Sequence, residues 1–183
     1  MPTPFAHAVG GLAAAFLTNS TANRPRLTMP ILATSAALAV SPDLDIIAGL
    51  HRVYTHSIAA VAVVGIVSWL VLRTRTTEAL PLAAVLTAAY ASHAVLDLLG
   101  KDTSPPLGLT VLWPFSSHYY LTGWNVFTEV SRRYWRPDEF IFGNLRALSH
   151  EMLVLLPVLI LTWALWSKKT LSHSNENRRP KNE

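Results

Sequence analysis

The sequence predicts an all-α fold, a multi-pass transmembrane bundle of about five helices. Hydrophobic residues make up 51% of the 183 residues and charged residues only 14%, and the mean hydropathy is +0.31. This balance is too apolar for an ordinary soluble domain of this length. The apolar residues form separate runs, interrupted by short basic or proline-containing segments. We expect one membrane-embedded domain at residues 1–167, followed by a disordered, polar and basic tail at 168–183.

Two helices are expected in the first part of the chain. The first covers Phe5–Thr18 and is short for a complete span. Thr28 can cap the second helix, with Pro30 in its first turn. The apolar run Ile31–Val40 covers roughly half of the hydrocarbon thickness at about 1.5 Å per residue. A complete span must therefore continue past Pro42, and broken helices of this kind are tolerated where they line a polar cavity.

Three more helices are expected after residue 57. The apolar runs Ile58–Leu72 and Ala79–Leu99 are each expected to span the membrane. The segment Lys101–Pro137 is a long connection rich in aromatic residues, which is typical of a membrane–water interface. The last helix is expected to begin near Asp138, and Met152–Trp166 is its apolar part.

Basic residues mark one side of this expected bundle. Pairs of them lie at alternate turns, and these are Arg24 and Arg26, Arg73 and Arg75, and Lys168 and Lys169. The positive-inside rule assigns this side, with the C-terminus, to the cytoplasm. Arg132, Arg133 and Arg136 in the opposite connection argue against this orientation, although long connections bear less on the rule. The opposite, extracytoplasmic side then receives most of the histidine and aspartate side chains.

The segment 41–57, SPDLDIIAGLHRVYTHS, concentrates side chains that bind metals. It carries Asp43, Asp45, His51 and His56 between two apolar runs. Ionisable side chains are costly at membrane depth, so their presence indicates a function. The chain has no cysteine. Histidine and carboxylate ligands must therefore hold any metal, which suits zinc, manganese or magnesium.

Other candidate ligands are expected at the same end of the bundle. His93 and Asp97 lie one helical turn apart and project from one face, and His7 is the only ionisable residue on the first helix. Together with the four residues above they exceed what one ion needs, so we expect one or two divalent cations. Zinc fits best, with manganese or magnesium as alternatives. Weaker candidates on this side are Asp102, His118, His150 and Glu151.

This set of residues predicts metal-dependent hydrolysis of a phosphoester or phospholipid-like substrate. Paired metals activate water and stabilise a displacement at phosphorus. Asp43 or Asp45 would bridge two ions or accept the proton of the water, and Arg52 would orient an anionic substrate. Arg52 can equally extend toward lipid headgroups. Membrane lipids are the expected partners, and nucleic acid is not expected.

Two other classes of protein are compatible with the same residues. The first is a non-catalytic membrane protein that binds, senses or transports divalent metal. The second is a structural or regulatory membrane protein, in which these side chains form a hydrogen-bonded polar network without metal. A transporter would carry ionisable groups near the bilayer midplane on several helices, whereas here they gather toward one end.

Four motifs in order resemble the membrane-bound metal-dependent hydrolase family, described as LexA-binding, inner-membrane-associated hydrolases. They are P-D-L-D at 42–45, H-R-V-Y-T-H-S at 51–57, S-H-A-V-L-D at 92–97 and W-P-F at 113–115. The resemblance runs from His7 to about Tyr120. It implies a multi-pass protein of the inner membrane with metal-dependent hydrolase activity.

The order of the ligand-type residues also resembles, more loosely, the zinc-dependent phospholipase C and single-strand nuclease group. This resemblance implies metal ligation, and the residues at matching positions are His7, Asp45, His56, His93 and Asp97. The chain lacks the second H-x-x-x-D motif of that group, because His150 is followed by Glu151 and has Val154 at the fourth position. A site with three zinc ions is therefore not expected.

Overall fold

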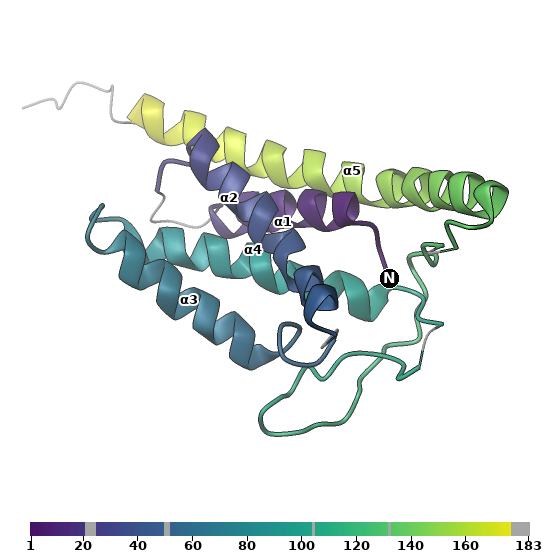
Figure 1. Ribbon diagram of the computed structural model, residues 1–183. Coiled ribbons are helices and arrows are strands. Elements are labelled where there is room, and N and C mark those ends of the chain that lie inside the picture. The colour runs from purple at the N-terminus through teal and green to yellow at the C-terminus, as the bar shows by residue number, and fades with distance from the viewer. Residues whose placement is uncertain (21–24, 50–51, 104, 132, 177–183) are drawn as a thin grey trace, which may run out of the picture.

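The computed structural model describes residues 1–20, 25–49, 52–103, 105–131 and 133–176. Within these ranges the chain is helical and has no β-strand, which confirms the all-α class. The helices are α1 (Pro4–Thr18), α2 (Met29–Val40), the 3₁₀ helix η1 (Ser41–Ala48), α3 (Ile58–Leu72), α4 (Ala79–Leu99) and α5 (Pro137–Glu176). An irregular connection joins α4 to α5 (Figure 1).

Local sequence explains where several of these helices begin and end. The Thr3 hydroxyl accepts a hydrogen bond from the backbone N–H of Ala6 at 3.2 Å, and Ser57 caps α3 in the same way through Ala60 at 3.3 Å. At Pro42 the chain changes from α to 3₁₀ geometry, which is the form that the expected proline break takes. Gly49 then ends η1 with φ at 67°, a left-handed conformation that glycine adopts without strain.

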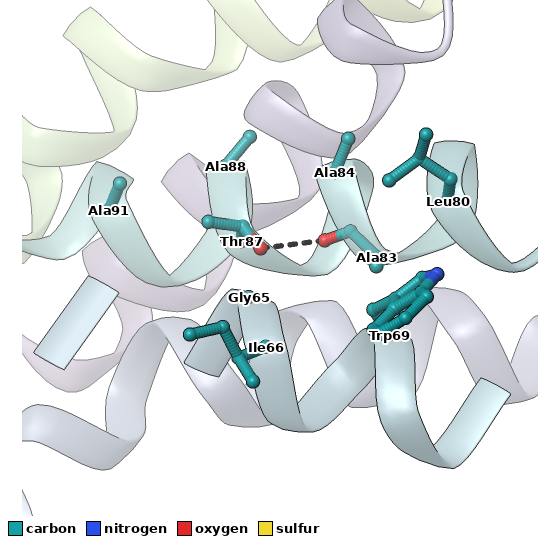
Figure 2. A pocket seen from close by; sticks show the side chains of 9 residues that line it. All are labelled: Gly65, Ile66, Trp69, Leu80, Ala83, Ala84, Thr87, Ala88 and Ala91. Carbon is teal, nitrogen blue, oxygen red and sulfur yellow. Dashed lines mark hydrogen bonds between the residues drawn. The ribbon is translucent and has the colours of Figure 1, made fainter. Parts of the chain in front are cut away.

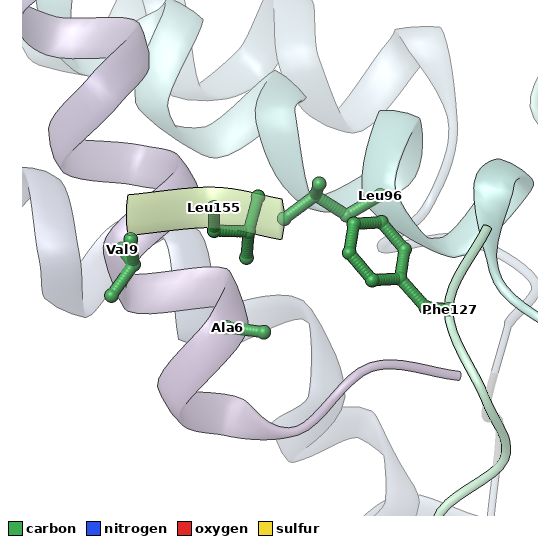
Figure 3. Packing of buried hydrophobic residues seen from close by; sticks show 5 residues of the cluster. All are labelled: Ala6, Val9, Leu96, Phe127 and Leu155. Atoms are coloured by element: carbon green, nitrogen blue, oxygen red, sulfur yellow. The ribbon is translucent and has the colours of Figure 1, made fainter. Parts of the chain in front are cut away.

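α4 is the central helix of the bundle. It packs against α1, α2 and α3, while α5 packs along α1. One of the apolar cores joins α1, α4, α5 and the connection between α4 and α5 (Figure 3). Its buried members are Ala6, Val9, Leu96, Phe127 and Leu155. The residues that follow Ala6 and Leu96 are His7 and Asp97, so this core fixes the positions of two candidate ligands.

An open apolar groove runs between α3 and α4, with a volume of about 540 Å³. Trp69 and Ile66 of α3 face small side chains of α4 across it, among them Ala84 and Ala88 (Figure 2). Apolar surface of this extent suits contact with lipid.

Among the described residues, three helical segments are long and apolar enough to cross a membrane: Met29–Ile47, Ala79–Leu99 and Pro137–Lys169. The first joins α2 to η1, as expected for a span that continues past Pro42. α1 and α3 have 15 residues each. They are shorter than the ~20 residues that a straight span needs, so the structure offers fewer full-length spans than the five expected.

α5 is longer than the sequence indicated. It has 40 residues, contains Pro157 without a break, and ends at Glu176. The helix therefore extends into the segment 168–183 that we expected to be a disordered tail. Residues 177–183 of that segment lie outside the described ranges.

Gly11 allows α1 and α2 to approach each other closely. A Cβ atom on Gly11 would lie 2.4 Å from Ala39 Cβ and 3.0 Å from the Ser35 carbonyl oxygen. The Gly11→Ala substitution is therefore expected to lower the free energy of unfolding by about 1–3 kcal/mol, because one of the two helices must move. Thermal unfolding in detergent would measure this as a lower midpoint.

Gly143→Ala is the matched control. Its new Cβ would meet nothing closer than Ser131 Cβ at 3.9 Å, and alanine favours the helix over glycine. A midpoint for Gly11→Ala equal to that of the control would contradict the close packing of α1 and α2.

Candidate metal centre

Four separate segments bring ligand-type side chains to one end of the bundle. The beginning of α1, η1, the residues before α3 and the end of α4 lie together there (Figure 1). Lys169 lies at the other end of the bundle. There Lys169 Nζ of α5 donates to the Ser20 carbonyl oxygen at 2.6 Å. The convergence expected from the sequence is thus present in the fold.

Four of the predicted ligands form a compact group that could hold a metal ion: Asp43, His56, His93 and Asp97. One ligand atom from each lies within 4.8 Å of the other three. The Nε2 atoms of His56 and His93 are 3.0 Å apart. Asp97 Oδ2 lies 3.3 Å from His93 Nε2 and 3.5 Å from His56 Nε2. Asp43 Oδ1 is 3.5 Å and 3.8 Å from the same two nitrogens.

The other ring nitrogen of each histidine is held by an oxygen atom. His93 Nδ1 is 2.7 Å from the Ala39 carbonyl oxygen, which can only accept, so this nitrogen carries the proton. His56 Nδ1 is 2.9 Å from Thr55 Oγ1, and the Thr55 hydroxyl donates to Asp45 Oδ2 at 2.5 Å. Because that hydroxyl proton is used, His56 Nδ1 is the donor in its contact with Thr55. Such partners orient metal-ligating histidines and fix their tautomer.

This tautomer assignment leaves two nitrogen lone pairs facing each other. In neutral rings that carry the proton on Nδ1, the Nε2 atoms of His56 and His93 are both acceptors. Both oxygens of Asp97 are buried and make no hydrogen bond within the described residues. A buried carboxylate without a hydrogen-bond partner is costly. A cation between Asp97 and the two imidazoles would lower this cost. Ligand atoms around a tetrahedral zinc ion lie about 3.3 Å apart, so the observed spacings fit.

The centre is enclosed on most sides and opens at Asp43. The side chains of His56 and Asp97 are 0% exposed and that of His93 is 1%, whereas that of Asp43 is 27% exposed. Asp43 also makes the longest contact of the group. Asp43 is therefore the member of the group that faces the outside, beside η1.

His7 lies against this group without being one of its four members. Its ring stacks on His93, with centroids 3.8 Å apart and planes at 17°. His7 Nε2 is 3.5 Å from Asp97 Oδ1, the oxygen that is turned away from the first group. Neither ring nitrogen of His7 makes a hydrogen bond within the described residues, and the residue is fully buried. His7 and Asp97 Oδ1 therefore place two more ligand-type atoms beside the group of four.

Asp45 and Arg52 lie one step away from the ligand group. Asp45 Oδ2 accepts hydrogen bonds from Arg52 N at 3.1 Å and from Thr55, and lies 3.4 Å from His56 Nδ1. It therefore supports His56 from behind. The Arg52 guanidinium is buried, and its Nη1 donates to Asp102 Oδ2 at 2.7 Å. Asp102 also accepts from Gly108 N at 2.8 Å, so the pair fastens the α4–α5 connection to the segment before α3.

The remaining predicted residues are not brought into the group. His118 is exposed in the connection, and His150 is half-buried on α5. Glu151 is fully buried, and its two carboxylate oxygens accept from Thr3 N at 2.8 Å and from Thr3 Oγ1 at 2.5 Å. It therefore holds the beginning of α1, the helix that carries His7. His51 lies outside the described residues.

Two groups that shape the centre were not predicted from the sequence. The first is the Ala39 carbonyl oxygen, which orients His93. Every residue has a backbone carbonyl group, so the sequence does not show which one contacts the histidine. The Tyr90 hydroxyl donates to the Thr55 carbonyl oxygen at 2.6 Å and so ties α4 to the His56 segment. Tyr90 lies one turn before His93 on the same helix, and this spacing could have indicated that it lies near the centre.

Comparison with known proteins agrees with the membrane setting of this centre. A family model described as YdjM inner membrane protein matches residues 1–171. The chain belongs to this family. No curated protein and no solved structure matches the chain. Membership of an inner membrane protein family, together with the three candidate spans, confirms the predicted membrane location, whereas hydrolytic activity stays a prediction.

Proposed function

We propose that the chain is a membrane-bound hydrolase that acts on a phosphoester or phospholipid-like substrate with one or two divalent cations. The observation that carries the proposal is the group of two imidazole nitrogens and two carboxylate oxygens, of which Asp43 supplies the most exposed side chain. Zinc fits this donor set best, and manganese or magnesium are alternatives.

His56, His93 and Asp97 are the residues that hold the ion. Two histidines and one carboxylate are a ligand set of catalytic zinc sites, which leave the fourth position for water or substrate. Their enclosure excludes bulk water, and Thr55, Asp45 and the Ala39 carbonyl group keep the two imidazoles in place. His7, with the second oxygen of Asp97, supports binding of a second ion.

Asp43 acts as the general base. Its carboxylate lies at the open edge, 3.5 Å from His93 Nε2, and is the least buried of the four side chains. A divalent cation held by His56, His93 and Asp97 would activate a water molecule and would stabilise the negative charge that develops on the phosphoryl oxygens. Asp43 takes one proton from this water as its oxygen bonds to phosphorus. The ester P–O bond breaks, and the proton passes to the departing alcohol oxygen.

A second candidate function follows from the number of ligands. If Asp43 coordinates the same ion as the other three residues, four protein ligands close the coordination sphere, as in structural zinc sites. The chain would then bind or sense divalent metal without hydrolysis. The distances of 3.5 Å and 3.8 Å from Asp43 to the two imidazoles are compatible with this arrangement.

Removal of the metal tests the proposed function. The purified protein in lipid nanodiscs is expected to hydrolyse bis(p-nitrophenyl) phosphate, to lose this activity after treatment with EDTA, and to regain it when zinc is added back. Manganese and magnesium are added in parallel to identify the effective ion. A protein that carries stoichiometric metal but turns over neither this substrate nor phospholipid would support the metal-binding alternative.

A further inference from the structure

The opening of the metal centre lies on a segment whose exposed side chains are aliphatic. Asp43 is part of η1, where Leu44, Ile46 and Ile47 are exposed by 62%, 49% and 84%. In a 3₁₀ helix residues i and i+3 lie above one another. Ile46 is therefore next to Asp43 along η1, and Leu44 and Ile47 form the adjoining row. Apolar surface beside a binding site is typical of contact with lipid or an apolar ligand.

Aromatic side chains of the α4–α5 connection lie next to the same centre. Ile58 N donates to the Val111 carbonyl oxygen at 2.8 Å, which holds the connection against the segment that contains His56. The rings of Tyr54 and Trp113 meet edge to face with centroids 5.0 Å apart. Tyr54 is 46% exposed and the nearby Phe115 is 86% exposed. Aromatic residues of this kind gather at the level of lipid headgroups.

These residues form what we call the rim, and they are Leu44, Ile46, Ile47, Tyr54, Trp113 and Phe115. Arg52 and Lys101 are the only lysine or arginine residues in 41–57 and 100–120. The Arg52 guanidinium is buried and bonded to Asp102, so Lys101 is the one exposed lysine or arginine of these two ranges. A centre that captures anionic phosphoesters from water is expected to present several exposed cations that attract them. The rim presents aliphatic and aromatic surface instead.

We propose that the substrate is a phospholipid of the surrounding membrane, whose acyl chains pack on the rim while its phosphate lies beside Asp43. This proposal rests on the proposed hydrolase function and specifies its substrate. The water oxygen bonds to the lipid phosphorus, one P–O bond to an alcohol breaks, and that alcohol leaves with the proton. The phospholipid reaches the centre from the bilayer, so the rim contributes binding energy that a small soluble phosphoester cannot use.

Substitution of an exposed rim residue tests this substrate class. Ile47→Ser, at a position outside the metal group, is expected to lower kcat/KM for a long-chain phospholipid by about tenfold or more, because it removes apolar contact with the acyl chains. Hydrolysis of bis(p-nitrophenyl) phosphate and the metal content should not change. Ile160→Ser on α5, where Ile160 is 61% exposed, is the matched control and should change neither rate. Equal loss with both substrates, or no loss with phospholipid, would overturn the proposal.

A second measurement is independent of turnover. The sequence contains no cysteine, so Ile47→Cys provides a single position at which a fluorescent bimane can be attached. Phosphatidylcholine brominated on its acyl chains is expected to quench this label, and to quench a label at Thr74 far less, because Thr74 is exposed between Arg73 and Arg75 in the polar turn after α3. A label at position 47 that is not quenched places the rim in water and overturns the proposal. Quenching without hydrolysis of either substrate would instead contradict the hydrolase function while the rim still contacts lipid.

Discussion

The His93→Ala variant is expected to lose the bound metal. His93 Nε2 lies within 3.5 Å of ligand atoms from Asp43, His56 and Asp97, so its removal leaves the other three without their common neighbour. Partners that only orient a ligand are worth about 10–100-fold in metal affinity. Loss of a direct ligand should exceed that, and we expect the dissociation constant for zinc to rise by more than about 100-fold. Elemental analysis after gel filtration and chelator competition would measure this.

Asp45→Ala and His118→Ala provide the comparison. Asp45 acts on the ion through Thr55 and His56, so its substitution should weaken zinc binding by only about 10–100-fold. His118 is exposed and outside the group, and its substitution should change nothing. If His93→Ala keeps one equivalent of metal, or binds it as tightly as His118→Ala does, the ion is not held by this group.

Asp43 and Asp45 have different roles in the structure that their sequence does not distinguish. The motif P-D-L-D contains two carboxylates, and both were predicted to be metal ligands because nothing in the motif favours one over the other. The 3₁₀ geometry of η1 separates them, because Asp43 faces the Nε2 side of His56 and Asp45 faces its Nδ1 side. Residue type alone carries no information about this difference.

Local periodicity predicted the parts of the centre that depend on one helix. His93 and Asp97 are an i,i+4 pair on α4, and both contribute to the ligand group. The convergence at one end also followed from the order of the apolar runs and the basic segments. Contacts between distant segments could not be derived in this way. Arg52 was predicted to orient substrate because it is a cation beside the candidate ligands. Its ion pair with Asp102 could not be predicted, because Asp102 lies far away in the sequence, in the connection after α4.

The lengths of the apolar runs were informative only in part. Ile58–Leu72 was expected to span the membrane. α3 has only 15 residues, fewer than a straight span needs, yet none of them is buried. Packing on α4 therefore does not explain its apolar composition, which fits contact with lipid. Residues 168–176, which were assigned to the polar tail, are helical in the structure. Polar residues form helix where a longer helix is already nucleated.

Replacing Asp43 by asparagine is expected to separate hydrolysis from metal binding. Asparagine keeps the size of the side chain but cannot take a proton from water. If Asp43 is the general base, hydrolysis of bis(p-nitrophenyl) phosphate should fall by about 10²–10⁴-fold. The metal content should stay within about twofold of the wild type, because His56, His93 and Asp97 still hold the ion. Rates and elemental analysis on the same preparation would measure both quantities.

The same variant decides between the two candidate functions. A fourth ligand that closes the coordination sphere would lower metal affinity when it is changed, and no activity would be present to lose. Asp138→Asn, in the exposed first turn of α5, is the control for loss of a carboxylate and should match the wild type in both measurements. Loss of activity with metal retained assigns Asp43 to proton transfer. Loss of metal assigns it to the ion, and the opening beside η1 would then lead to a closed centre rather than to a site for water and substrate.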